Sequence, residues 1–85
     1  MITIYSKPTC SFCDAAKNRL ARWGYEYTEV DVSQEEAGLK FLKDEGHRTV
    51  PQIYYTETQF VPDGASGLAV LGKDGFQSLL EKAGE

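Results

Sequence analysis

Hydrophobic and polar residues alternate over residues 2–5, which predicts a short β-strand at the start of the chain. Pro8 ends this strand, because proline has no N–H to donate to a sheet. Apolar residues then recur at helical spacing from Cys10 to Gly24, and glycine is the residue that most often follows a helix. The predicted apolar face of this first helix comprises Phe12, Ala16, Leu20 and Trp23.

The next part of the chain repeats this strand–helix order. Residues 27–32 alternate and predict a second strand. Ser33 and Glu36 have the spacing of a capping box, so a second helix is expected to open there and to stop near Gly46. Residues 52–55 predict a third strand, which the chain enters through Pro51.

The C-terminal third has a weaker periodicity. Pro62-Asp63-Gly64 predicts a turn, with short β-prone pieces on either side at residues 59–61 and 68–71. Asp74 is a suitable cap for a last helix. The apolar face of that helix comprises Phe76, Leu79, Leu80 and Ala83.

These elements predict a single α/β domain over residues 1–85, in the order β-α-β-α-β-β-α. The first two strands are joined through a helix and should be parallel, with a right-handed crossover. The closing pair is joined by turns and should be antiparallel. The expected architecture is a four-stranded mixed sheet flanked by three helices.

Composition narrows the range of partners. The net charge of −4 argues against a nucleic-acid backbone as the main partner. The longest clearly apolar run, residues 68–71, is far too short to cross a membrane. The first residues lack the charged start and long apolar stretch of a signal peptide, so a cytoplasmic location is expected.

The charge is unevenly distributed along the chain, and the cysteines lie in its most basic part. Residues 1–24 hold four basic residues against one acidic residue, a net charge of +3 in an acidic chain. The chain's two cysteines, Cys10 and Cys13, both lie in this basic third. A cationic setting favours the thiolate form and attracts anionic thiols or disulfides.

Cys10 and Cys13 form a CxxC motif at the point where a strand has ended and a helix begins. Free backbone amides and the helix macrodipole favour a thiolate at the first position. Cys13 lies one turn further on and is expected to be more covered. The spacing therefore predicts that Cys10 attacks a disulfide and that Cys13 resolves the resulting mixed disulfide.

Three structural interpretations compete with this one. A disulfide staple over four residues restricts the unfolded chain by only about 2 kcal/mol. A structural zinc site needs two more ligands, and His47 is the only histidine. Two inert buried cysteines are the remaining alternative.

Residues 5–10, Cys13 and residues 49–53 together resemble the glutaredoxin branch of the thioredoxin-fold family, with weaker agreement at Gly72 and Asp74. The resemblance covers nearly the whole chain. It implies a thioredoxin-like fold and a cytoplasmic, monomeric, glutathione-dependent thiol–disulfide oxidoreductase. The implied partners are glutathione and disulfide-bonded or glutathionylated proteins, with ribonucleotide reductase among the candidates and with no metal.

The resemblance also implies which residues hold glutathione. Lys7 and Arg48 would meet the glycine carboxylate, Phe12 would form an aromatic wall, and the backbone of Val50 would pair with the substrate. Pro51 resembles the family's cis-proline. Gly72, Lys73 and Asp74 match the wall that anchors the γ-glutamyl group.

Some residues depart from the family pattern. Ser11 replaces a frequent proline, Phe12 replaces a tyrosine, and Leu71 stands where the family usually has a glycine. Two other functions therefore stay open. One is a thioredoxin-like redoxin that is reduced by a flavoprotein reductase and serves ribonucleotide reductase, and the other is a carrier of a glutathione-ligated iron–sulfur cluster.

Overall fold

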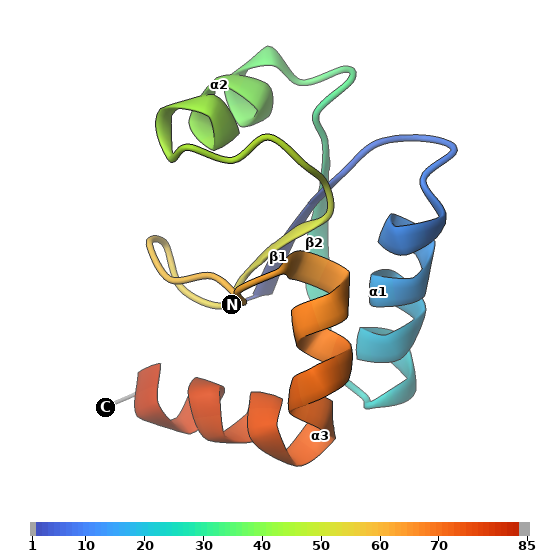
Figure 1. Cartoon of the computed structure of the whole chain (residues 1–85), viewed down its shortest axis with the longest axis vertical. Helices are drawn as coiled ribbons and strands as arrows, with labels where there is room; N and C mark the ends of the chain where they lie inside the picture. Colours follow the sequence, from blue (N-terminus) through green and yellow to red (C-terminus); the bar gives the residue numbers. More distant parts are fainter. Residues whose placement is uncertain (1, 84–85) are drawn as a thin grey trace.

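In the computed structural model, which describes residues 2–83, three strands and three helices alternate along the chain (Figure 1). The predicted domain of residues 1–85 thus has residues 1, 84 and 85 outside the described part. The elements are β1 (Ile2–Ser6), α1 (Ser11–Arg22), β2 (Tyr27–Asp31), α2 (Glu36–Asp44), β3 (Gln52–Tyr54) and α3 (Gly64–Ala83).

The sheet has the strand order β2-β1-β3 in residues 2–83. β1 pairs in parallel with β2, as the strand–helix–strand pattern predicted, and antiparallel with β3. The site described below lies where β1 leads into α1 and where the chain enters β3.

The predicted fourth strand is wrong. Residues 59–61 do return antiparallel to β3, but they form only an isolated bridge between Tyr54 and Phe60. Residues 68–71 belong to α3. A short apolar run has no period that separates a strand from a helix. Here Ala65, Leu68 and Leu71 follow at helical spacing and pack into one core cluster.

A break at Gly72 divides α3 into two segments that run in different directions (Figure 1). Gly72 has φ 69° and ψ 178°, a conformation that only glycine adopts readily. The second segment begins after Gly72, so Asp74 lies in its first turn and not at the predicted cap position. An acidic residue there still interacts favourably with the helix dipole.

The predicted capping box of α2 is also absent. The backbone N–H and the hydroxyl of Ser33 both donate to Oδ1 of Asp31, at 2.9 and 2.6 Å. The chain therefore makes one more turn before α2 begins at Glu36, with Glu35 as its cap residue. Asp31, at the end of β2, thus binds the Ser33 hydroxyl that the capping-box pattern predicted would bind the first turn of α2.

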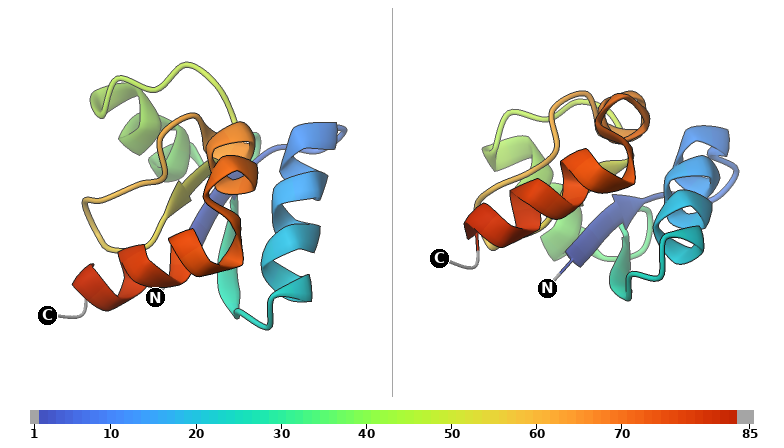
Figure 2. Two further views of the ribbon diagram at one scale, coloured as in Figure 1. Left: turned by 60° about the horizontal axis from the view of Figure 1, so that its bottom comes forward. Right: turned by 90° about the horizontal axis from the view of Figure 1, so that it is seen from below.

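Helices cover both faces of the sheet (Figure 2). α1 and α3 cover one face, where the buried residues of the larger core cluster are Ile2, Ile4, Ala16, Leu20, Ile53, Val61, Leu68 and Phe76. α2 covers the other face over a smaller cluster of Val32, Leu42 and Tyr54. Within residues 2–83 no helix is both long and apolar enough to cross a membrane.

Candidate active site

The two cysteines lie at the amino end of α1 and form a disulfide, with their Cα atoms 5.2 Å apart. Cys10 is the cap residue, and its Sγ accepts a hydrogen bond from the backbone N–H of Cys13 at 3.2 Å. Cys10 is 9% exposed, whereas Cys13 is completely buried. The motif therefore offers the sulfur of Cys10 to an incoming reactant and holds Cys13 behind it.

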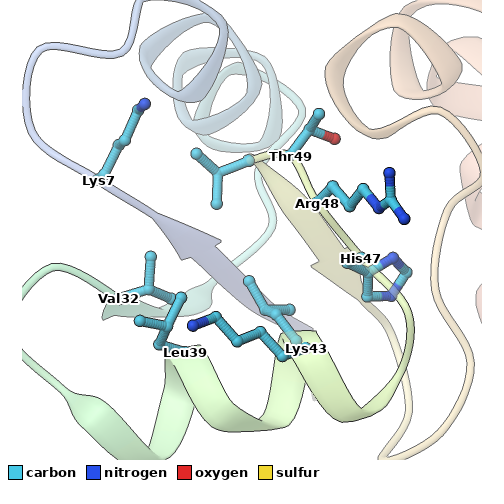
Figure 3. A pocket seen from close by; sticks show the side chains of 9 residues that line it. Lys7, Val32, Leu39, Lys43, His47, Arg48 and Thr49 are labelled. Carbon is cyan, nitrogen blue, oxygen red and sulfur yellow. The ribbon is translucent and has the colours of Figure 1, made fainter.

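The loop from β1 to α1 brings Lys7 and Cys10 to the same end of the sheet. Thr9 adopts a positive φ of 56°, which turns the chain sharply into the cap of α1. Lys7 is exposed, and its side chain extends from this loop (Figure 3). A cation just before a helix N-terminus adds to the positive potential that the backbone amides create at Cys10.

The peptide bond between Val50 and Pro51 is cis, as the resemblance implied. Gln52, which is buried, fixes the turn before it by donating from Nε2 to the carbonyl oxygen of Thr49 at 2.8 Å. Val50 is half-buried. The hydrogen bond from Gln52 thus fixes the backbone of residues 49–51, which lines a pocket together with Phe12 of α1.

A small pocket of about 160 Å³ joins this turn to the cysteine motif. It is lined by Phe12, Thr49, Val50, Pro51, Asp63, Gly64, Ala65 and Ser66. Phe12 is 65% exposed, so its predicted place on the buried face of α1 is wrong. Cys13, Ala16 and Leu20 form that face instead, one position further along, and Phe12 is left as a side wall of the small pocket.

The amino end of α3 forms the far wall of the small pocket, which the sequence analysis missed. Gly64 packs so closely that a Cβ atom there would lie 2.5 Å from the carbonyl oxygen of Pro51. In the sequence, only the predicted turn at Pro62-Asp63-Gly64 indicates a tight backbone at this position. That the turn packs against Pro51 depends on the tertiary fold. Gly72, Lys73 and Asp74 line neither this pocket nor the one described next.

A larger hollow of about 480 Å³, here called the basic pocket, lies between α2 and the loop that leads to Pro51 (Figure 3). Lys7, Lys43, His47 and Arg48 line it together with Thr49 and Val50. Its remaining lining residues are apolar: Val32, Leu39 and Leu42. Thr49 and Val50 also line the small pocket, so the two hollows share a wall.

His47 is anchored at the edge of the basic pocket. Its Nε2 lies 2.8 Å from the hydroxyl of Tyr54, and its ring packs edge-on against Phe60 with centroids 4.5 Å apart. Burial raises the pKa of Tyr54 to about 12, so the hydroxyl keeps its proton at neutral pH. His47, in the loop after α2, is thus held by its contacts with Tyr54 of β3 and with Phe60.

An ion-pair network ties α1 to the sheet one turn beyond Cys13. Nζ of Lys17 lies 2.9 Å from Oε2 of Glu29 and 3.5 Å from Oδ1 of Asp14. The hydroxyl of Ser6 donates to the same Oε2 of Glu29 at 2.6 Å. The bonds from Ser6 and then Lys17 hold the pKa of Glu29 below its usual range.

The described residues include no group of three or more histidine, cysteine, aspartate or glutamate side chains placed to hold a metal ion. A disulfide-forming cysteine pair beside a cis-proline turn and a basic pocket can exchange disulfides with a bound thiol compound. This chemistry needs the two sulfurs and a way to stabilise a thiolate, both of which these elements supply.

Comparisons with known proteins agree with this chemistry. A family model described as Glutaredoxin matches residues 2–61. Glutaredoxin-2 from the mitochondria of Bos taurus is 36% identical over 78 residues, which make up 87% of this chain but only 48% of the bovine protein. Glutaredoxin 1 of Rickettsia felis is 36% identical over 84 residues, 94% of this chain and 80% of that protein.

Among solved structures, the glutaredoxin from Brucella melitensis matches with a TM-score of 0.73 and 33% sequence identity. The match covers 99% of this chain and 90% of that one. The chain therefore spans about half the length of the bovine relative and most of the length of the two bacterial ones.

Proposed function

Because this chain belongs to the glutaredoxin family of thiol–disulfide oxidoreductases, we propose that it reduces protein disulfides and glutathione mixed disulfides with electrons from glutathione. One observation carries the proposal. The more accessible cysteine, Cys10, caps α1 at the end of the sheet that also presents Lys7 and the turn at Pro51.

In the proposed reaction the Cys10 thiolate attacks one sulfur of the substrate disulfide. A bond forms between Sγ of Cys10 and that sulfur, the substrate S–S bond breaks, and the leaving thiolate takes up a proton. The Cys13 thiol then loses its proton and attacks Sγ of Cys10, which closes the disulfide and releases the second thiol. Two electrons have passed from the dithiol to the substrate.

Glutathione restores the dithiol in the same way. One glutathione thiolate forms a mixed disulfide with Cys10 and frees Cys13, and a second glutathione releases oxidised glutathione. When the substrate is itself a glutathione mixed disulfide, the second glutathione acts directly on Cys10. This last reaction does not need Cys13.

The two pockets supply groups that suit glutathione, which carries two carboxylates and two peptide units. Lys7 and Arg48 offer cations to its glycine carboxylate, since cation–carboxylate hydrogen bonds are the stronger kind. In this proposal the backbone of Val50 pairs with the peptide of glutathione beside Pro51, and Phe12, which lines the same small pocket, covers its other side. Gly72, Lys73 and Asp74 have no part in this proposal, because they line neither pocket.

The test compares reductants. Reduction of a glutathionylated peptide is followed with glutathione, glutathione reductase and NADPH, and separately with thioredoxin reductase and NADPH. We expect turnover in the first system, complete loss in Cys10→Ser and retention in Cys13→Ser. Turnover only with thioredoxin reductase would instead identify a thioredoxin-like redoxin, and activity in Cys10→Ser would show that the nucleophile is assigned wrongly.

A further inference from the structure

The basic pocket is more extensive than the glutathione contacts proposed above require. Its α2 side adds Lys43 and an apolar floor of Val32, Leu39 and Leu42 (Figure 3). Leu39 is 39% exposed, which leaves a large apolar side chain open at the pocket. Glutathione has no apolar side chain that would cover such a floor.

The pocket is also strongly one-sided in charge. Lys7, Lys43 and Arg48 line it, and its lining includes no acidic residue. Within residues 2–83 no carboxylate lies within salt-bridge distance of these three cations, because the ion pairs found there involve Lys17. Three cations without an ion-pair partner among the described residues thus surround one hollow in a chain whose net charge is −4.

The basic pocket and the cysteines are linked through Thr49 and Val50. Both residues line the basic pocket and also the small pocket beside Phe12. A peptide whose cysteine has joined Cys10, and whose backbone follows Val50, would therefore pass along both hollows. An extended peptide advances about 3.3 Å per residue, so only the nearest neighbours of that cysteine enter the hollow.

We propose that the α2 side of the basic pocket selects protein disulfides in which the cysteine is flanked by an acidic and an apolar residue. Lys43 attracts the carboxylate, and Leu39 contacts the apolar side chain. The proposal rests on the proposed exchange at Cys10 and names its preferred protein substrates. The partner is a peptide segment of a disulfide-bonded protein, since the same hollow offers cations for a carboxylate and an apolar floor for its neighbour.

The test uses symmetrical disulfides of short peptides that each contain one cysteine. One peptide has glutamate and leucine beside the cysteine, a second has glutamine in place of the glutamate, and a third has lysine. The fully reduced protein is mixed with each disulfide, the reaction is stopped with acid, and the released peptide thiol is measured. The glutamate peptide should react about fivefold faster than the glutamine peptide at low salt, and the difference should shrink at high salt.

Lys43→Glu is the informative variant and Lys40→Glu its matched control. Both substitutions change the charge of an exposed lysine on α2 by the same amount, but Lys40 lines neither pocket. Lys43→Glu should abolish most of the preference for the glutamate peptide, because a carboxylate then stands beside the remaining cations Lys7 and Arg48, whereas Lys40→Glu should keep the order of the unaltered protein. Equal effects of both variants, or no preference in the unaltered protein, would overturn the proposal.

Two further measurements separate this proposal from the proposed function. Reaction of every variant with oxidised glutathione reports the exchange itself, so a loss of that reaction counts against the proposed function alone. Binding of the reduced peptides to Cys10→Ser, followed by NMR, needs no exchange and should rank the peptides in the same order, with shifts at Leu39 and Lys43. If the glutamate, glutamine and lysine peptides bind equally well, the proposed selection by α2 is wrong, even when the protein shows no disulfide exchange.

Discussion

The backbone N–H of Cys13 donates to the sulfur of Cys10 over 3.2 Å, at the positive end of the α1 dipole. After reduction the same N–H would stabilise a thiolate on Cys10, whereas Cys13 is completely buried. We expect the single thiol of Cys13→Ser to react with iodoacetamide at pH 7 at least about ten times faster than that of Cys10→Ser. The rates are measured by mass spectrometry of the intact protein.

A cation variant tests the electrostatic part of this argument. Lys7→Gln, made in the Cys13→Ser background, should slow alkylation of Cys10 by about twofold, since an exposed charge acts through screened solvent. Lys73→Gln removes the same charge at a residue that lines neither pocket and should leave the rate unchanged. Equal slowing by both variants would mean that only the net charge of the protein matters.

The network around Glu29 predicts a pH-dependent contribution to stability. Glu29→Gln should lower the free energy of unfolding by about 0.5–1 kcal/mol at pH 7, a small effect because the Glu29 side chain is 41% exposed. Its folded pKa lies below the unfolded value, so the contribution is complete above the unfolded pKa and disappears as the pH falls through the folded one.

Urea unfolding at pH 7 and pH 3 measures this effect. The difference between the unaltered protein and Glu29→Gln should be smaller at pH 3 than at pH 7. Glu57→Gln serves as control, because Glu57 is exposed and takes part in neither of the ion pairs found in residues 2–83. A difference that grows toward acid pH would show that Glu29 is not held in its charged form.

The break in α3 predicts a stability effect without a catalytic one. Gly72→Ala should destabilise the protein by about 1–3 kcal/mol, because an alanine avoids the backbone conformation of Gly72. Its rate with oxidised glutathione should stay unchanged, since Gly72 lines neither pocket. Urea unfolding and a rate measurement on the same sample give both results, with Ser78→Ala, at an exposed helical position, as control.

Asp74→Asn tests whether residues 72–74 anchor the γ-glutamyl group of glutathione. If the amino end of α3 at residues 63–66, which lines the small pocket, forms this wall instead, the variant should bind glutathione disulfide as the unaltered protein does. A clear loss of binding would instead support the wall that the sequence pattern assigned to residues 72–74.

Local patterns were sufficient for much of the fold. The alternation in residues 2–5 and the CxxC at a strand–helix junction predicted β1, the start of α1 and the placement of Cys10 at its cap, all of which are confirmed. The parallel pairing of β1 with β2 followed from the helix between them. Each of these features depends on residues close together in the sequence.

Features that depend on distant contacts were predicted less well. Helical spacing alone does not decide whether Phe12 or Cys13, one position along, faces the core, and the structure buries Cys13 and exposes Phe12. The run at residues 68–71 predicts a strand as readily as a helix, because four apolar residues carry no decisive period, and the structure places the run inside α3. The close approach of Gly64 to Pro51 is likewise a contact that only the folded chain shows.

That contact gives the last prediction. Gly64 combines a φ of 54° with a position in which a Cβ atom would lie 2.5 Å from the carbonyl oxygen of Pro51. Gly64→Ala should therefore force the amino end of α3 away from the turn at Pro51, at a cost of about 2 kcal/mol in the free energy of unfolding. The small pocket would widen, and exchange with oxidised glutathione should slow severalfold.

Stability and rate must fall together in this variant, whereas Gly72→Ala should lower stability alone. Ala69→Ser, at an exposed position of the same helix, controls for a general effect on α3. A Gly64→Ala protein that keeps its full exchange rate while losing stability would show that the α3 wall is not part of the site. Because the two glycine variants strain the same helix at different distances from Pro51, their comparison isolates what the close packing at Gly64 contributes to the exchange reaction.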